Sequence, residues 1–471
     1  MTMRNKILLV ASIVLTLTTS NVIAKGNIKN SWLALSKAEL KHVQSYNEEY
    51  KSFIDRARTE LTFVAETKKL VEKSGFKQLT DDSQIITGAK LYSINRDRAM
   101  TLMVIGTKPI ADGVRIAGAH IDSPRIELKG RPLYEKNGFA LFQTYTHGGM
   151  KNYQWVNIPL ALIGRVDKKD GSHVNINIGL NNNDPVLIIP DLAPHVDRDY
   201  RKRTNREVIK KEELDIIIAS KPGNDSTVQQ EVTNFLKNNY GISITDLVSA
   251  ELALVPAVKP RDVGLDRSMV AAYGQDDKIS AFAAVKSILE IDETEFTAIT
   301  FLVDNEEVGN LNNTGADSSY LVDTISQLLY QQSPQTYNDY LLRKTLRKTK
   351  VISVDVNPGV NPNWPGVWEL GNAPKLGEGI NIKLYGGGFN ANSEYIAWTR
   401  NYLDNAGILW QTSTYKGKAS GGTIGSALSE NNMDVIDFGV PVLGMHSPYA
   451  VASKVDIYSM YTAMKAFYLN K

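Results

Sequence analysis

The strongest constraint on the fold is the regular alternation of apolar, strand-like runs with helix-like segments after about residue 262. Buried strands are expected at 297–303, 350–356, 408–412 and 435–443, and helices at 278–290, 319–331, 393–404 and 454–468. Such alternation is typical of strands that are covered by helices. It predicts an α/β fold with a mixed, largely parallel sheet and helices on both faces.

The stretch before residue 262 divides into two parts of different character. Residues 30–75 are helix-like, and strands are expected at 90–94, 100–105 and 114–119. Residues 125–261 instead carry alternating runs at 156–166, 174–178 and 186–189, with one helix at 227–238 opened by a Ser226…Gln229 capping box. We therefore expect a catalytic α/β domain of residues 25–124 and 262–471, interrupted by an inserted β-rich domain of residues 125–261.

The N-terminus has the pattern of a secretory signal. Arg4 and Lys6 precede an apolar stretch at 7–17, and compact residues end at Ala24, before a cut at Lys25. We predict a signal peptide of residues 1–24 and export to the periplasm or the medium, with an uncleaved anchor as the alternative. No later stretch reaches the roughly 18 apolar residues of a membrane span, so no stable membrane insertion is expected after cleavage.

Composition excludes several classes of site. Lys and Arg number 53 against 51 Asp and Glu, a net charge of +2, which gives no electrostatic argument for nucleic acid. The chain has no Cys, so disulfides, cysteine nucleophiles and thiolate metal sites are excluded. With 6 His in the chain, a metal centre would have to rely on carboxylates.

Ionisable residues stand at the ends of the predicted strands, where open α/β sheets bind ligands. His120 and Asp122 lie on the same side of an extended segment, so the carboxylate could orient the imidazole toward a metal. A hydrogen-bonded structural histidine at a strand end is an equally good interpretation. Asp276 precedes a helix, where an aspartate is more often a cap.

Three further strand ends add carboxylates and a second histidine. Glu306 and Glu307 follow an apolar strand and repel each other unless a cation or proton intervenes, although a surface loop is an alternative. Asp355 interrupts an apolar strand and needs an ion-pair partner, a cap or a metal. His446 follows another apolar run. Together these residues would suit a carboxylate-bridged pair of Zn²⁺ ions, with one Glu left as a general base.

The ordered motifs resemble the dizinc aminopeptidases of the aspartyl aminopeptidase and vacuolar aminopeptidase I family. The motifs are His120-x-Asp122, Asp276-Asp277, Glu306-Glu307-Val308-Gly309, Asp355 and Met445-His446-Ser447. Segments 147–151, 189–195, 421–425 and 453–458 are also similar to that family. The resemblance covers nearly the whole mature chain and implies a zinc-exopeptidase-like fold acting on peptide substrates.

Specific roles follow from the resemblance. It implies that Asp276 bridges two Zn²⁺ ions per subunit (Co²⁺ or Mn²⁺ in their place), with His120 and Asp355 completing one site and Glu307 and His446 the other. Glu306 would take a proton from the zinc-activated bridging water, and Asp122 would orient His120. The resemblance also implies that the insertion dimerises and that the dimers assemble further, commonly to dodecamers.

The chain departs from the family at positions that bear on specificity. Acidic-selective members carry a Lys between two glycines, where this chain has Glu378, and a glutamate there would repel an acidic side chain. We therefore predict a neutral or basic first residue in the substrate. Glu378, Gly422 and Thr423 are the candidate substrate-binding residues.

Two other functions compete with this prediction. A carboxypeptidase or acyl-amino-acid amidohydrolase on the same scaffold would need an arginine for the substrate carboxylate, and only Arg125 adjoins one of the motifs. A metal-free relic that serves as an assembly module would have lost ligands, yet every ligand position and Glu306 are filled.

Overall fold

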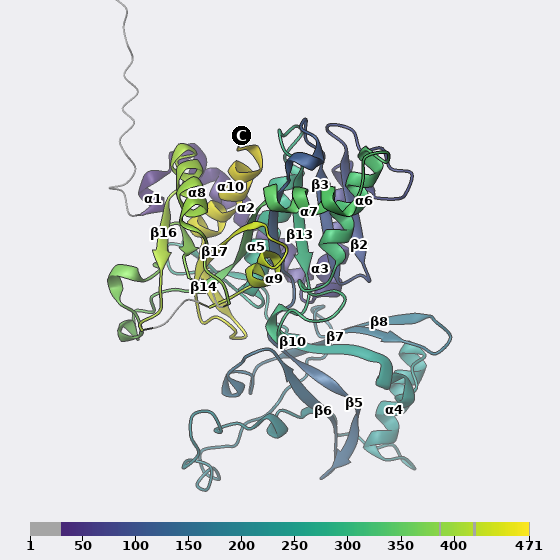
Figure 1. Ribbon diagram of the computed structural model, residues 1–471. Coiled ribbons are helices and arrows are strands. Elements are labelled where there is room, and N and C mark those ends of the chain that lie inside the picture. Colours follow the sequence, from purple (N-terminus) through teal and green to yellow (C-terminus); the bar gives the residue numbers. More distant parts are fainter. Residues whose placement is uncertain (1–29, 386–387, 418–420, 471) are drawn as a thin grey trace, which may run out of the picture.

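The computed structural model describes residues 30–385, 388–417 and 421–470, which form a larger α/β part and a smaller β-rich part (Figure 1). The predicted signal peptide, residues 1–24, lies outside the described residues. Among the residues that are described, no helix is long and apolar enough to cross a membrane.

In the described part of the chain, twelve strands form the large sheet. Its centre consists of four parallel strands in the order β13-β4-β14-β17, and antiparallel strands flank them on both sides. The predicted mixed α/β fold is therefore confirmed. The strands are β1 (Lys77–Gln78), β2 (Lys90–Asn95), β3 (Ala99–Val104), β4 (Arg115–His120), β11 (Arg261–Val263), β12 (Met269–Ala272), β13 (Ala298–Val303), β14 (Lys350–Pro358), β15 (Ile380–Lys383), β16 (Trp410–Ser413), β17 (Asp434–Leu443) and β18 (Ala450–Ser453).

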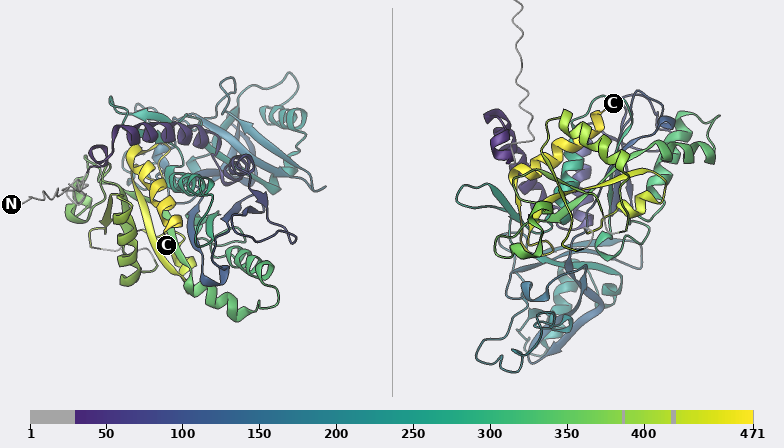
Figure 2. Two further views of the ribbon diagram at one scale, coloured as in Figure 1. Left: turned by 90° about the horizontal axis from the view of Figure 1, so that it is seen from above. Right: turned by 60° about the vertical axis from the view of Figure 1, so that its left-hand side comes forward.

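Helices cover both faces of this sheet because successive strand residues point to opposite sides. In β4, Ala117 packs into the core under α2, α3, α5, α8 and α10, whereas Ile116 packs into the core under α6, α7 and α9. Figure 2 shows the two layers from above, with α2 in purple and α10 in yellow on one side and green α6 and α7 on the other. The helices are α1 (Ser31–Ala34), α2 (Lys37–Arg56), α3 (Glu60–Lys73), α5 (Gln275–Leu289), α6 (Tyr320–Gln332), α7 (Asp339–Lys348), α8 (Ser393–Asn405), α9 (Gly425–Ser429) and α10 (Lys454–Leu469).

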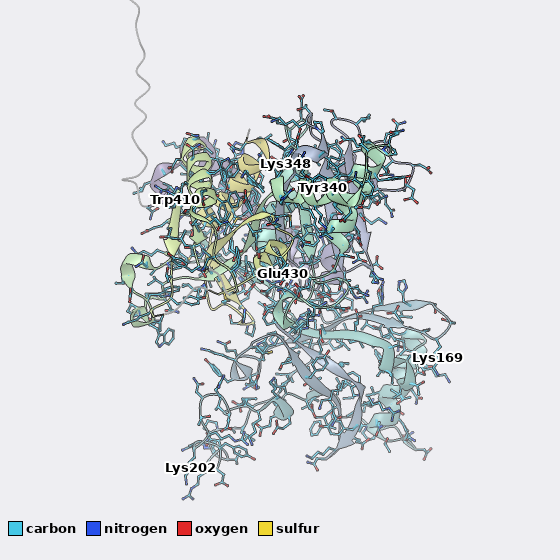
Figure 3. All side chains as sticks on the ribbon, in the orientation of Figure 1. Lys169, Lys202, Tyr340, Lys348, Trp410 and Glu430 are labelled. Carbon is cyan, nitrogen blue, oxygen red and sulfur yellow. The ribbon has the colours of Figure 1, made fainter. Side chains whose placement is uncertain are left out.

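A second sheet of six strands, in the order β8-β7-β10-β5-β6-β9, has an apolar core of its own. Helix α4 (Val228–Tyr240) packs against β5, β6 and β9. In Figure 3, Lys202 marks a loop of this part far from the large sheet, whereas Tyr340 and Lys348 mark α7 on the large sheet. The strands are β5 (Arg125–Lys136), β6 (Phe139–His147), β7 (Leu160–Asp167), β8 (His173–Ile178), β9 (Ile216–Ala219) and β10 (Ala250–Pro256).

Local details of the second sheet differ from the sequence-based expectations. The capping box of α4 joins Thr227 to Gln230, one residue later than expected, because the Ser226 hydroxyl donates to Glu231 instead. The expected strand at 186–189 is reduced to two isolated bridges, at Leu187 and Ile188. Strand β7 begins at Leu160, after Pro159, rather than at 156.

Candidate metal centre

The candidate residues gather where the central parallel strands end. In the sheet register, His120 at the end of β4 is level with Val303 at the end of β13, and Ser353 of β14 is level with Gly118. Asp355 therefore lies at the height of His120. Because parallel strands share one carboxyl edge, the residues that follow β13 and β17 reach the same place.

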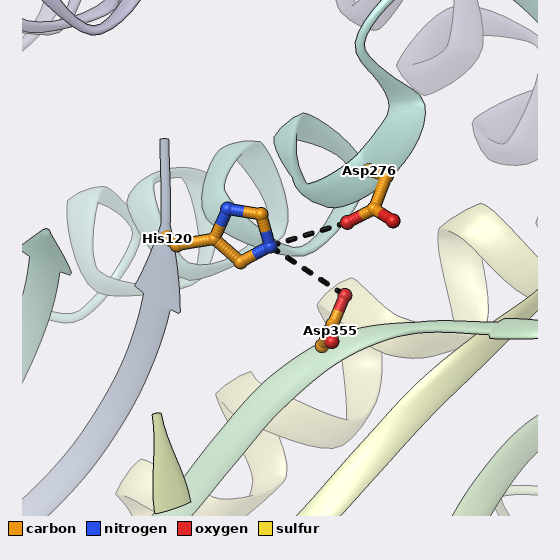
Figure 4. Close-up of side chains that lie close together, drawn as sticks. All are labelled: His120, Asp276 and Asp355. Atoms are coloured by element: carbon orange, nitrogen blue, oxygen red, sulfur yellow. Dashed lines mark hydrogen bonds and ion pairs between the residues drawn. The ribbon is translucent and has the colours of Figure 1, made fainter. Parts of the chain in front are cut away.

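The first half of the cluster joins β4, the start of α5 and β14. His120 Nε2 lies 3.1 Å from Asp276 Oδ1 and 3.7 Å from Asp355 Oδ1 (Figure 4). One ligand atom from each residue lies within 4.8 Å of the other two. Asp276 is not an N-cap of the usual kind, because its carboxylate faces His120 and His446 and caps no backbone N–H group of α5.

The second half uses the other oxygen of Asp276. His446 Nε2 lies 2.9 Å from Asp276 Oδ2 and 3.5 Å from Glu307 Oε1. One ligand atom from each of Asp276, Glu307 and His446 lies within 4.8 Å of the other two. The Asp276 carboxylate therefore stands between two histidines, with one oxygen toward each.

Two carboxyl groups support this arrangement without lying between the histidines. Asp122 is fully buried, with Oδ1 3.2 Å from His120 Nδ1, and it accepts the backbone N–H groups of Glu306 and Glu307 at 3.2 Å each. Glu306 has a carboxyl oxygen 3.8 Å from His120 Nε2, and its side chain is 18% exposed. Glu306 is therefore open to solvent at the edge of the cluster, whereas Asp122 is not.

The electrostatics of the cluster favour uptake of positive charge. Burial, reinforced by the charges of Asp355 and Asp276, raises the pKa of Glu306 to about 7 although His120 opposes the shift. Burial and the charge of Asp276 raise the pKa of Glu307 well above its usual value. Burial disfavours a charged His446, but its hydrogen bond with Asp276 still raises the pKa of this imidazole to about 10. Crowded carboxylates thus hold protons, which a divalent cation would displace.

The donor set fits Zn²⁺. Imidazole nitrogens and carboxylate oxygens are its usual ligands after thiolates, which this chain lacks. Glu307 Oε1 is buried without a hydrogen-bond partner, although it faces His446, so this oxygen is free to coordinate. The same donors also accept Co²⁺ or Mn²⁺.

Two residues at the cluster were not predicted from the sequence. His147 at the end of β6 places Nε2 2.9 Å from Asp122 Oδ2, and buried Lys383 of β15 places Nζ 3.4 Å from Asp355 Oδ2. The available signals were a histidine before two glycines and a lysine that ends a run of strand residues. Neither signal shows which residue His147 or Lys383 contacts, because their partners, Asp122 and Asp355, lie in other parts of the chain.

The candidate substrate-binding residues lie outside the five-residue cluster. Glu378 precedes β15 and forms an ion pair of 3.7 Å with Lys375. Since β15 is antiparallel to β17, with Asn381 paired to Gly439, Glu378 lies toward the carboxyl end of β17. Gly422 and Thr423 precede α9, and the Thr423 hydroxyl is buried without a hydrogen-bond partner.

A cleft of about 860 Å³ opens beside the second half of the cluster. His446 and Met445 line it from the side of the large sheet, and residues 149–154, 205–207 and 209–212 line it from the second part of the chain. The cluster is therefore reachable from a groove to which both parts of the molecule contribute.

Comparisons with known proteins agree with this donor set. The family described as aminopeptidase I zinc metalloprotease (M18) matches residues 53–468. A Clostridium acetobutylicum protein named "Probable M18 family aminopeptidase 1" is 40% identical over 459 residues, which cover 94% of this chain and 98% of the relative. The crystal structure of an M18 aminopeptidase from Thermotoga maritima matches with a TM-score of 0.90 at 36% identity, covering 94% of this chain and 99% of that one. A dodecamer structure of mApe1 from S. cerevisiae shares the fold, with a TM-score of 0.73 at 22% identity over 90% of this chain and 96% of that one.

Proposed function

Because the chain belongs to the M18 family of zinc aminopeptidases, we propose that it hydrolyses the N-terminal peptide bond of peptides at the carboxyl edge of its large sheet. The observation that carries the proposal is the placement of Asp276, with one oxygen toward His120 and the other toward His446. The prediction from the motifs that the chain is an aminopeptidase of this family is confirmed. Its narrower assignment to the aspartyl and vacuolar aminopeptidase I group stays a prediction.

In this proposal five side chains hold two zinc ions. Asp276 is shared, His120 and Asp355 complete one site, and Glu307 and His446 complete the other. Bound zinc would act as a Lewis acid that polarises the scissile carbonyl and lowers the pKa of a water molecule. The distances among these side chains and the free Glu307 oxygen support the assignment.

Glu306 is the proposed general base. Its carboxyl oxygen lies 3.8 Å from His120 Nε2 at the solvent-exposed edge of the cluster, where a carboxylate can accept a proton from water and a carboxylic acid can return it to the leaving amine. Asp122 holds the backbone amides of Glu306 and Glu307 and the far nitrogen of His120. It therefore positions the base and one metal ligand with a single carboxylate.

Replacing Glu306 tests the mechanism. The Glu306→Gln variant is expected to lower kcat by about 10²- to 10⁴-fold, since it keeps the shape of the side chain but cannot take up the proton. Zinc content, measured by elemental analysis, stays at two per subunit. The exposed Glu430→Gln variant serves as the matched control with unchanged kcat. Wild-type turnover in Glu306→Gln would rule out the base assignment.

The structure disfavours the carboxypeptidase and amidohydrolase alternatives. Arg125, the arginine next to the motifs, is buried and already forms ion pairs with Glu60 at 3.1 Å and Glu127 at 2.7 Å. It is therefore not free to bind a substrate carboxylate. Acetylation of a test peptide's N-terminus is expected to abolish cleavage, and continued cleavage would favour the alternatives.

The preferred first residue is proposed to be neutral or basic. The support is Glu378, whose charge is only partly offset by Lys375, since both side chains are partly exposed. A panel of aminoacyl-coumarin substrates is expected to give faster turnover for neutral or basic residues than for Asp or Glu. Glu378→Lys is expected to raise the relative rate for acidic residues. Fastest wild-type turnover of the Asp or Glu substrate would contradict this preference.

Assembly and location complete the proposal. We propose that residues 125–261 form a dimerisation domain and that dimers assemble further, in line with the dodecamer of the distant relative mApe1. Mass photometry of the purified protein would measure the subunit number.

We also propose that residues 1–24 direct export to the periplasm or the medium, and an N-terminus beginning at Lys25 in the mature protein would support that prediction.

A further inference from the structure

We propose that residues 147–149, at the end of β6 in the second sheet, are a positioning segment for the metal ligands of the large sheet. This inference rests on the proposed function, because it concerns the same cluster. The five proposed ligands lie in strands of the large sheet, in α5, or in the turns that follow β13 and β17, whereas this segment comes from the other part of the molecule. Each of its three residues contacts a different member of the cluster or its support.

His147 acts on the first half of the cluster through Asp122. Its Nε2 lies 2.9 Å from Asp122 Oδ2, while Asp122 Oδ1 lies 3.2 Å from His120 Nδ1. Both imidazoles are buried, so water does not compete for these contacts. A proton on His147 Nε2 holds the carboxylate, and the carboxylate in turn keeps His120 Nε2 pointing at Asp276.

Gly149 acts on the second half through a backbone carbonyl. Its oxygen lies 2.6 Å from His446 Nδ1, and since a carbonyl can only accept, Nδ1 carries the proton. The other nitrogen, Nε2, is then free for a metal. His446 needs such support, because its side chain is 33% exposed and its backbone φ of +62° is one that non-glycine residues rarely adopt.

Gly148 brings the segment against Glu307. A Cβ built at this position would lie 3.0 Å from Glu307 Oε2 and 3.1 Å from Glu307 Cβ, and φ is +74°. Only glycine allows both the backbone angle and the close approach without displacing Glu307. Because residue 148 has no side chain, the Glu307 side chain can occupy the position that it has in the cluster.

A change in zinc affinity distinguishes a role in positioning the ligands from a general effect on folding. Partners that orient metal ligands typically change metal affinity by about 10- to 100-fold when removed. Gly148→Ala is expected to lower the affinity for one of the two zinc ions about 10-fold or more, as measured by a chelator competition titration. Gly138→Ala is the matched control, since it has nearly the same φ, +78°, at the β5–β6 turn but no atom within 4 Å of the added Cβ.

A second pair of variants tests His147. Gln at this position places a donor near the site of Nε2, whereas Leu supplies none. His147→Gln is expected to keep zinc affinity close to wild type, and His147→Leu is expected to weaken it about 10-fold or more. The melting temperatures of the metal-free proteins report folding separately.

The possible outcomes distinguish this inference from the proposed function. A wild type that binds fewer than two zinc ions or does not cleave peptides would contradict the proposed function. A functional wild type with equal zinc affinity in Gly148→Ala and Gly138→Ala would overturn the positioning role. If Gly148→Ala does not fold, equal zinc affinity in His147→Leu and His147→Gln would overturn it instead.

Discussion

At the residue scale, the buried cation Lys383 balances the crowded acids of the site. Its Nζ lies 3.4 Å from Asp355 Oδ2, and both side chains are largely buried. The charge of Asp355 raises the pKa of Lys383 above its usual value, against the effect of burial. Lys383 is therefore charged in the metal-free protein and offsets one carboxylate of the cluster.

Removing this cation is expected to destabilise the metal-free protein more than the zinc-loaded one. Lys383→Met leaves Asp355 buried without its ion-pair partner, a loss of about 3–5 kcal/mol in comparable cases. Zinc would supply the missing positive charge, so the difference from wild type is expected to shrink when it is added. Chemical denaturation with and without zinc measures both values. An equal loss in the two states would contradict the role of Lys383 as a counter-charge.

At the element scale, helix α10 holds the loop that leads into β15. Asp456 in its first turn accepts the backbone N–H groups of Gly377 at 2.6 Å and Gly379 at 2.9 Å. These two glycines flank Glu378, so the helix fixes the position of the proposed specificity residue. Burial raises the pKa of Asp456 to about 7 although both amides act against the shift.

This raised pKa gives a pH-dependent prediction with a definite sign. The folded state holds a proton on Asp456 that the unfolded chain releases near its ordinary pKa of about 4. The stability from this group is therefore complete below about pH 4 and is lost as the pH rises toward 7. Asp456→Asn lacks this titration, so the melting temperature of the wild type relative to the variant is expected to fall between pH 4.5 and 7. A constant difference over that range would contradict the assignment.

The central strands of the large sheet were predictable because burial leaves a clear record in the sequence. Runs such as 297–303 are apolar on both faces, and an ionisable residue at their ends is conspicuous. The convergence of His120, Asp276 and His446 followed from the shared carboxyl edge of parallel strands. Strands β5 and β6 were not predicted, since β5 exposes mainly charged residues and β6 exposes Phe139 and Tyr145, so neither shows a clear alternation of apolar and polar residues.

Supporting residues were harder to predict than ligands for a physical reason. His147 and Lys383 act on the cluster through Asp122 and Asp355, which lie 25 and 28 residues away in the chain. Nothing in the local pattern says which carboxylate a buried cation or imidazole will meet. The capping box of α4 was misplaced by one residue because Ser226 and Thr227 are both suitable N-caps, and the contact of Ser226 with Glu231 decides between them.

At the scale of the whole molecule, two sheets with separate cores meet at the candidate metal centre. The large sheet supplies the proposed ligands, and the second sheet supplies the 147–149 segment and one wall of the cleft beside His446. A peptide that enters this cleft would contact both parts. The relative placement of the two sheets is therefore part of the geometry of the site and not only of its surroundings.

The shared carboxylate of Asp276 has a consequence for how the protein would take up its ions. Its two oxygens already face His120 and His446, so neither ion would have to turn the carboxylate, and both would share its single negative charge. Because two divalent cations bound to one carboxylate repel each other, the second ion would bind more weakly than the first, and a zinc titration would show two steps.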